Sequence, residues 1–95
     1  MMRKKEKVKY LYLKIFAKAK ERAINNIISK SELNFVLSFI KIICKDEFNL
    51  IIHEMISCGL IRKTGKENYL LNEDYFKLLK MLDNHSRLYH YVGCW

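Results

Sequence analysis

The chain has 95 residues, a length that supports one domain around one modest hydrophobic core. Hydrophobic residues make up 51% of it, which excludes a disordered protein, and no apolar run is long enough to cross a membrane. The formal net charge is +8, and residues 1–22 hold nine Lys or Arg against two Glu. A basic amino-terminal segment on a nearly neutral body favours a polyanionic partner, and a solvated, solubilising helix face is the alternative.

Residues 8–24 are expected to form the first helix. Apolar residues recur there at helical spacing as one stripe: Val8, Leu11, Tyr12, Ile15, Ala19 and Ala23. Further apolar residues widen the stripe until the helix is apolar on nearly all sides: Tyr10, Leu13, Phe16 and Ala17. We therefore expect a second buried side, packed against another subunit. Residues 1–7 would form a basic arm in front of this helix.

Ile27 and Ile28 are expected to form a short strand that leads into a second helix. Ser29 and Glu32 have the spacing of a capping box, in which the Ser29 hydroxyl accepts from the amide three residues on. The helix is predicted to continue to about residue 43. Its buried stripe would be Leu33, Val36, Leu37, Ile40 and Ile43.

A third helix is predicted after a turn at residues 44–46, with Asp46 as its N-cap. Its core face would be Phe48, Ile51, Ile52, Met55 and Ile56, and the roughly opposite face would carry Lys45, Asn49, His53 and Ser57. Gly59 is expected to take the left-handed conformation that ends a helix.

Residues 60–63 and 68–71 are predicted to be two strands of a hairpin. Residues 64–67 form the turn, in which Gly65 would supply a positive φ. Asn72 is expected to cap a last helix, with buried positions at Tyr75, Leu78, Leu79 and Leu82. Residues 83–95 would extend it as a carboxy-terminal helix or tail. The tail aromatics are predicted to pack as a dimer contact, with stacking on nucleic acid as the alternative: Tyr89, Tyr91 and Trp95.

The segment Met55-Ile56-Ser57-Cys58-Gly59-Leu60-Ile61-Arg62-Lys63 joins a helix to a hairpin through Gly-Leu-Ile and basic residues. With the element order above, the chain resembles a winged helix-turn-helix domain over about residues 8–82, closest to small archaeal and viral transcription regulators. The resemblance implies a single α+β, mainly helical domain over residues 1–95, with a three-helix core, a β-hairpin wing and a carboxy-terminal helix. It also implies a cytoplasmic, homodimeric transcription regulator that binds specific sequences of double-stranded DNA.

The same resemblance would place the third helix in the major groove. It implies DNA contacts from that helix by Lys45, Asn49, His53 and Ser57. It implies further contacts from the wing by Arg62, Lys63 and Lys66, and the arm would add phosphate contacts by Lys4 and Lys5.

Two features depart from the family pattern. Asp46, Glu47 and Glu54 make the third helix acidic for a DNA-binding helix. This favours an alternative, a winged-helix module that binds protein in a replication, transcription or viral assembly. The spacing from Leu33 to Gly59 is about one helical turn longer than usual, and we ascribe this to a longer second helix.

Other chemistry has little support in the sequence. There is no Gly-rich phosphate loop and no Ser/His/Asp set in context, so we expect no enzyme activity. No CxxC or HxxH spacing joins the potential metal ligands Cys58, His85, His90 and Cys94. We therefore expect no metal, no cofactor, no small-molecule ligand and no membrane partner. Cys44 and Cys58 are predicted to be small core residues with reduced thiols.

Overall fold

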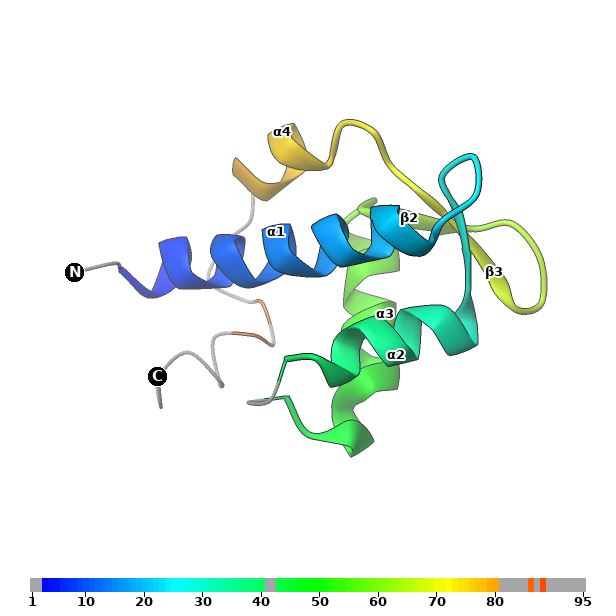
Figure 1. The fold of residues 1–95 in the computed structure, drawn as a ribbon. Helices are drawn as coiled ribbons and strands as arrows, with labels where there is room; N and C mark the ends of the chain where they lie inside the picture. The colour runs from blue at the N-terminus through cyan, green and yellow to red at the C-terminus, as the bar shows by residue number, and fades with distance from the viewer. Residues whose placement is uncertain (1–2, 41–42, 81–85, 87, 89–95) are drawn as a thin grey trace.

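The computed structural model describes residues 3–40, 43–80, 86 and 88 of the chain. Its elements follow in the order α1 (Lys4–Arg22), β1 (Ile27–Ser29), α2 (Lys30–Ser38), the 3-10 helix η1 (Lys45–Glu47), α3 (Phe48–Ser57), β2 (Ile61–Lys63), β3 (Asn68–Leu71) and α4 (Tyr75–Lys80). Within these residues the strands form one antiparallel sheet in the order β1-β3-β2, at one end of α1 (Figure 1). The α+β, mainly helical class expected from the sequence is confirmed.

Helix α1 begins earlier than the apolar stripe predicts. Residues 4–7 are its first turn rather than an arm in front of it, and the Lys7 N–H already donates to the Arg3 carbonyl at 3.0 Å. Lys and Glu are good helix formers, and Glu6 complements the positive end of the helix. The predicted stripe is buried except at Ala23, which is partly buried just after the helix ends at Arg22; with Phe16, the buried residues are Val8, Leu11, Tyr12, Ile15, Phe16 and Ala19.

A tight turn joins α1 to β1. Asn25 and Asn26 both have positive φ, at 54° and 65°. Ile24 and Ile27 exchange two backbone hydrogen bonds of 2.9 and 3.0 Å across them. Positive φ at both central residues is the type I′ geometry, which Asn adopts more readily than most residues. The chain therefore reverses directly into β1.

The sheet pairs β3 with a strand on each side. Ile28 lies opposite Tyr69, and Ile61 lies opposite Leu71; all four side chains are buried. The two predicted hairpin strands are confirmed. The predicted positive φ at Gly65 was wrong, because Gly59 is the glycine with positive φ among the described residues.

Helix α2 begins as predicted and ends early. The Ser29 hydroxyl accepts from the Glu32 N–H at 3.2 Å. The helix ends at Ser38, whose hydroxyl donates to the Phe35 carbonyl, and the Phe39 N–H donates to a carbonyl three residues back. Such local bonds compete with the next helical turn. The predicted extension of this helix to residue 43 was therefore wrong, and the extra spacing before Gly59 lies in residues 39–47.

Helix α3 has an unexpected beginning and the expected end. The predicted N-cap Asp46 lies inside η1, and α3 starts two residues later. At the other end Gly59 has φ 80°, and the Leu60 N–H donates to the Met55 carbonyl at 2.9 Å. The Gly59 N–H donates to the Ile56 carbonyl at 3.1 Å, which completes a Schellman motif. The left-handed Gly59 is confirmed.

Helix α4 covers much of the second apolar side of α1. Asn72 precedes it, and its side-chain oxygen accepts from the Asp74 N–H at 2.8 Å. The rings of Phe16 and Tyr75 stack with centroids 4.7 Å apart, and Leu79 is buried beside them. Leu82 and most of the predicted tail, with Tyr89, Tyr91 and Trp95, lie outside the described residues.

The described part of the chain contains no helix that combines the length and the apolar character needed to cross a membrane.

Candidate nucleic-acid interface

The outward face of α3 is polar and carries the side chains that the sequence analysis selected. Asn49, His53 and Ser57 follow one another four residues apart, about 6 Å along the helix, and all three are exposed. Lys45 is also exposed and precedes them in η1. The opposite face packs into the core through Phe48, Ile51, Ile52 and Met55. This row of polar side chains is therefore exposed on a helix that its opposite face fixes in the core. Side chains of these types can form hydrogen bonds with the edges of base pairs.

Glu54, the only acidic residue within α3, points away from this row. Its Oε2 accepts a hydrogen bond from the hydroxyl of Tyr12 in α1 and a second, of 2.8 Å, from the hydroxyl of Ser86. Burial, and then the charge of Glu54, raise the pKa of Tyr12 far above its ordinary value of 10.0. The expectation of an acidic outward helix was therefore wrong for Glu54, and Asp46 and Glu47 lie before the helix begins.

The wing follows α3 after three residues, but its cations do not share one face. Arg62 pairs with Leu70, and Lys63 pairs with the buried Tyr69. Because successive side chains of a strand point to opposite faces, Lys63 lies on the helix side of the sheet and Arg62 on the outer side. Arg62 lines a pocket together with Glu73 and Asp74, which come just before α4.

The wing turn is anchored on α2. The Lys30 N–H, at the start of α2, donates to the Glu67 carbonyl at 2.6 Å, and the Thr64 N–H donates to the Asn68 carbonyl at 3.0 Å. Lys66 is exposed in this turn. The bond to Glu67 therefore continues the β1–β3 pairing to the start of α2, and Lys66 is exposed in the turn beyond it.

Lys4 and Lys5 lie in the first turn of α1, at the end opposite to the sheet (Figure 1). Nineteen helical residues separate the two ends by about 28 Å. Three other α1 cations lie on two flanks: Arg22 contacts the Phe35 ring of α2, Lys18 contacts the Phe39 ring just after α2, and Lys20 contacts the Tyr75 ring of α4. The basic amino-terminal segment therefore does not form one continuous surface with the wing.

Comparison of the chain with protein-family models, curated proteins and solved structures gives no match. The site is therefore described by its own geometry alone.

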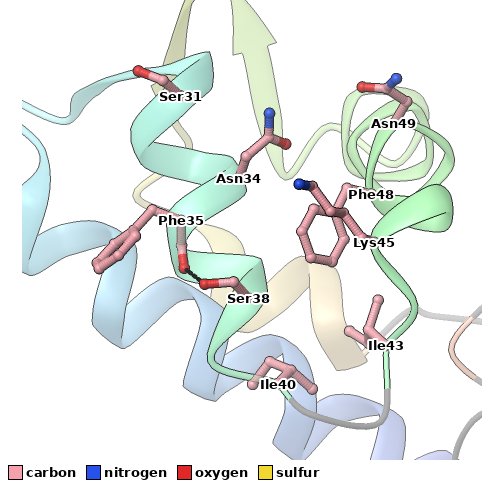
Figure 2. A pocket seen from close by; sticks show the side chains of 9 residues that line it. All are labelled: Ser31, Asn34, Phe35, Ser38, Ile40, Ile43, Lys45, Phe48 and Asn49. Atoms are coloured by element: carbon pink, nitrogen blue, oxygen red, sulfur yellow. Dashed lines mark hydrogen bonds between the residues drawn. The ribbon is translucent and has the colours of Figure 1, made fainter.

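An open groove of about 660 Å³ separates α2 from α3 (Figure 2). Lys45 and Asn49 line it, together with residues that the sequence analysis did not select: Ser31, Asn34, Phe35, Ser38, Ile40, Ile43 and Phe48. The signal was present in the sequence, because Ser31, Asn34 and Ser38 recur at helical spacing on the side of α2 opposite its buried stripe.

A second feature that the sequence analysis missed is a strip of exposed rings and cations along α1 and α2. Arg22 lies 4.1 Å from the centre of the Phe35 ring, and Lys18 lies 5.5 Å from that of Phe39. Both rings are about half exposed, at 47% and 49%. We call this set the aromatic–cation strip, which also includes Lys14 over the half-exposed ring of Tyr10 at 5.3 Å.

Metal chemistry has no support among the described residues, which contain no group of three or more His, Cys, Asp or Glu that could hold an ion. His85, His90 and Cys94 lie outside them. The prediction that Cys44 and Cys58 are core residues was wrong, because both are exposed. Cys44 lies just before η1, and Cys58 lies just after the last turn of α3.

Proposed function

We propose that the chain is a winged-helix protein that binds specific sequences of double-stranded DNA and regulates transcription. The order of helices and strands and the sheet order β1-β3-β2 are compatible with the winged-helix arrangement inferred from the sequence. In the proposed complex α3 enters the major groove and the wing lies beside it. Such a regulator acts on the genome, which agrees with the cytoplasmic location expected from the sequence.

The observation that carries this proposal is the composition of the outward face of α3. Asn49, His53 and Ser57 are exposed there, and Glu54 is turned toward Tyr12. A carboxylate on that face would repel phosphates and could accept hydrogen bonds only from the amino groups of cytosine and adenine. Its inward position removes one of the three acidic residues on which the objection to DNA binding rested, and the other two, Asp46 and Glu47, lie before α3.

The proposed contacts divide into two kinds. Asn49, with Lys45 and His53, would discriminate between base pairs, since an Asn amide pairs with adenine through two hydrogen bonds. Lys63 and Lys66 would contact phosphates, which adds affinity without sequence preference. Arg62 faces the other side of the sheet and is left out of the interface. Contacts of Lys4 and Lys5 with flanking phosphates stay a prediction.

The test is duplex binding measured at several salt concentrations with two matched variants. Lys63→Ala should weaken binding to all sequences alike and flatten the logarithmic salt slope by about one unit. Lys77→Ala removes the same charge from the exposed face of α4 and should leave the slope unchanged. Absence of duplex binding even at low salt would refute the proposed function.

The alternative is a protein-interaction module, and the aromatic–cation strip is the observation that favours it. Half-exposed Phe35 and Phe39 beside Lys18 and Arg22 offer apolar contact together with positive charge. An acidic amphipathic peptide would complement such a surface. The alternative predicts that Phe39→Ser abolishes partner binding, whereas the DNA proposal predicts that the same change leaves duplex affinity unaltered.

The homodimer expected from the sequence remains part of the proposal, but a smaller apolar surface of α1 is left to form it. Phe16 of α1 is covered by Tyr75 of the same chain, so part of the second apolar side needs no other subunit. Tyr10 remains 42% exposed on the same helix. A dimer would present two α3 helices to half-sites about one helical turn apart. A monomeric mass in light scattering at micromolar concentration would reject it.

A further inference from the structure

Among the residues that the structure describes, the groove between α2 and α3 combines apolar walls with one cation. Its apolar surface comes from Phe48, Ile40 and Ile43, all largely buried in the core beneath. Lys45 is the only charged residue among those that line it. A volume of about 660 Å³ lies within the roughly 300–1,000 Å³ range of small-molecule sites, which are mostly apolar with a few placed polar groups.

Asn34 supplies an unmet hydrogen-bonding group in this groove. Its side-chain oxygen is buried and has no hydrogen-bond partner among the described residues. Figure 2 shows Asn34 and Lys45 extending from opposite sides into the space between α2 and α3. Buried acceptors are nearly always paired in folded proteins. The groove therefore lacks a donor at Asn34 and an anion at Lys45.

We propose that this groove binds a small aromatic acid that carries an N–H or O–H donor. The carboxylate would bind the Lys45 ammonium, the donor would bind the Asn34 oxygen, and the ring would pack on Phe48. Inorganic anions fit less well, because they would leave the walls formed by Ile40 and Ile43 uncovered. An apolar molecule without charge would leave Lys45 and Asn34 unmatched.

Binding in the groove has a consequence that rests on the proposed function. Lys45 and Asn49 line the groove and are also proposed DNA contacts. A ligand that binds both side chains competes with the duplex for them. By linkage, the bound duplex lowers the affinity for the ligand by the same factor as the ligand lowers the affinity for the duplex. The acid would therefore act as an effector that releases DNA.

The test uses the full chain without DNA and three probes of nearly equal shape. Indole-3-acetate carries the ring, the donor and the carboxylate; 3-methylindole lacks the carboxylate; and 1-methylindole-3-acetate lacks the donor. Calorimetry should give a Kd of about a millimolar or tighter for indole-3-acetate, as expected for a ligand of its size. Loss of the carboxylate should weaken binding by about tenfold or more, since charge-assisted hydrogen bonds are the strong ones.

Two variants assign each contact through a double-mutant cycle. Lys45→Met should weaken the binding of indole-3-acetate by about tenfold and leave the binding of 3-methylindole unchanged. Asn34→Ala should weaken the binding of indole-3-acetate and leave the binding of 1-methylindole-3-acetate unchanged. Lys77→Met on α4 is the control for charge alone, and circular dichroism checks that each variant is folded. Equal affinities for the three probes, no binding at millimolar concentration, or an equal effect of Lys77→Met would overturn the proposal.

Ligand binding and DNA binding are then compared on the same preparation. Indole-3-acetate should lower duplex affinity for the unmodified chain and have no effect on the Lys45→Met variant. Ligand binding with no change in duplex affinity would support the groove and overturn its role as an effector site. Failure of duplex binding alone would refute the proposed function and leave the calorimetric result on the groove intact.

Discussion

Replacement of Tyr12 by Phe tests the contact that turns Glu54 away from the proposed interface. Tyr12 is fully buried on α1, and its hydroxyl donates to Glu54 on α3, 42 residues later in the chain. Ser86 donates to the same carboxylate oxygen at 2.8 Å. At neutral pH, loss of one hydrogen bond to a charged group should cost about 1.5–3 kcal/mol of unfolding free energy.

The larger signature of Tyr12→Phe lies at alkaline pH. Burial first, and the Glu54 carboxylate second, raise the pKa of Tyr12 far above 10.0, so the folded chain keeps this proton where the unfolded chain releases it. The stabilising contribution is complete below pH 10 and falls as the pH rises further. A residue that titrates at 10.0 only when unfolded lowers the unfolding free energy by about 1.4 kcal/mol at pH 11 and about 2 kcal/mol at pH 11.5.

The assay is denaturant unfolding followed by circular dichroism at pH 7, 10, 11 and 11.5. All lysines and the remaining tyrosines are common to both proteins, so the difference between their pH profiles isolates Tyr12. The gap between the unmodified chain and Tyr12→Phe should narrow by about 2 kcal/mol from pH 7 to 11.5. Tyr10→Phe, at a 42% exposed position of the same helix, should give the same profile of unfolding free energy against pH as the unmodified chain. Parallel profiles for the unmodified chain and Tyr12→Phe would refute the buried contact.

Two further predictions concern α3 and α2. Asn49→Ala should relax preference at one base position by about 1–3 kcal/mol without changing binding to random duplexes, as measured by selection from a random library. If it behaves like Lys63→Ala on specific and random duplexes, the proposed division between base and phosphate contacts is wrong. Ser29→Ala should lower the unfolding free energy by about 1 kcal/mol, because the Glu32 N–H loses its cap, with the exposed Ser57→Ala as the control.

Features of the fold that depend on local chemistry were predictable from the sequence. The cap at Ser29 and the left-handed Gly59 follow from residues within a few positions of each other. The buried stripes of α1 and α3 follow from helical spacing. The end of α2 was not predictable in this way, since apolar residues continue at helical spacing to Ile43 while Ser38 ends the helix through its own side chain.

The site was less predictable because its chemistry depends on contacts between distant segments. Glu54 has the appearance of a surface acid in the sequence, and only the approach of Tyr12 from α1 shows that it points inward. Arg62 and Lys63 are neighbours in sequence, and their pairing with β3 places them on opposite faces. Asn34 shares a polar side of α2 with Ser31 and Ser38 in the sequence, but only the position of α3 makes that side the wall of a groove.

The distribution of cations sets a quantitative limit on the proposed DNA complex. The sequence favours a large electrostatic contribution, because residues 1–22 contain nine Lys or Arg. In the fold Lys18 and Arg22 lie on one flank of α1 and Lys20 on another, and Arg22 is paired with Glu32 at 2.8 Å as well as stacked on Phe35. If phosphate contacts come from Lys63 and Lys66 alone, the logarithmic salt slope should be about −2 per protomer, at about −0.9 for each phosphate neutralised. A slope of −6 or steeper per protomer would mean that cations of α1 also contact the DNA phosphates directly. Helix α3 would then not be the main contact with DNA.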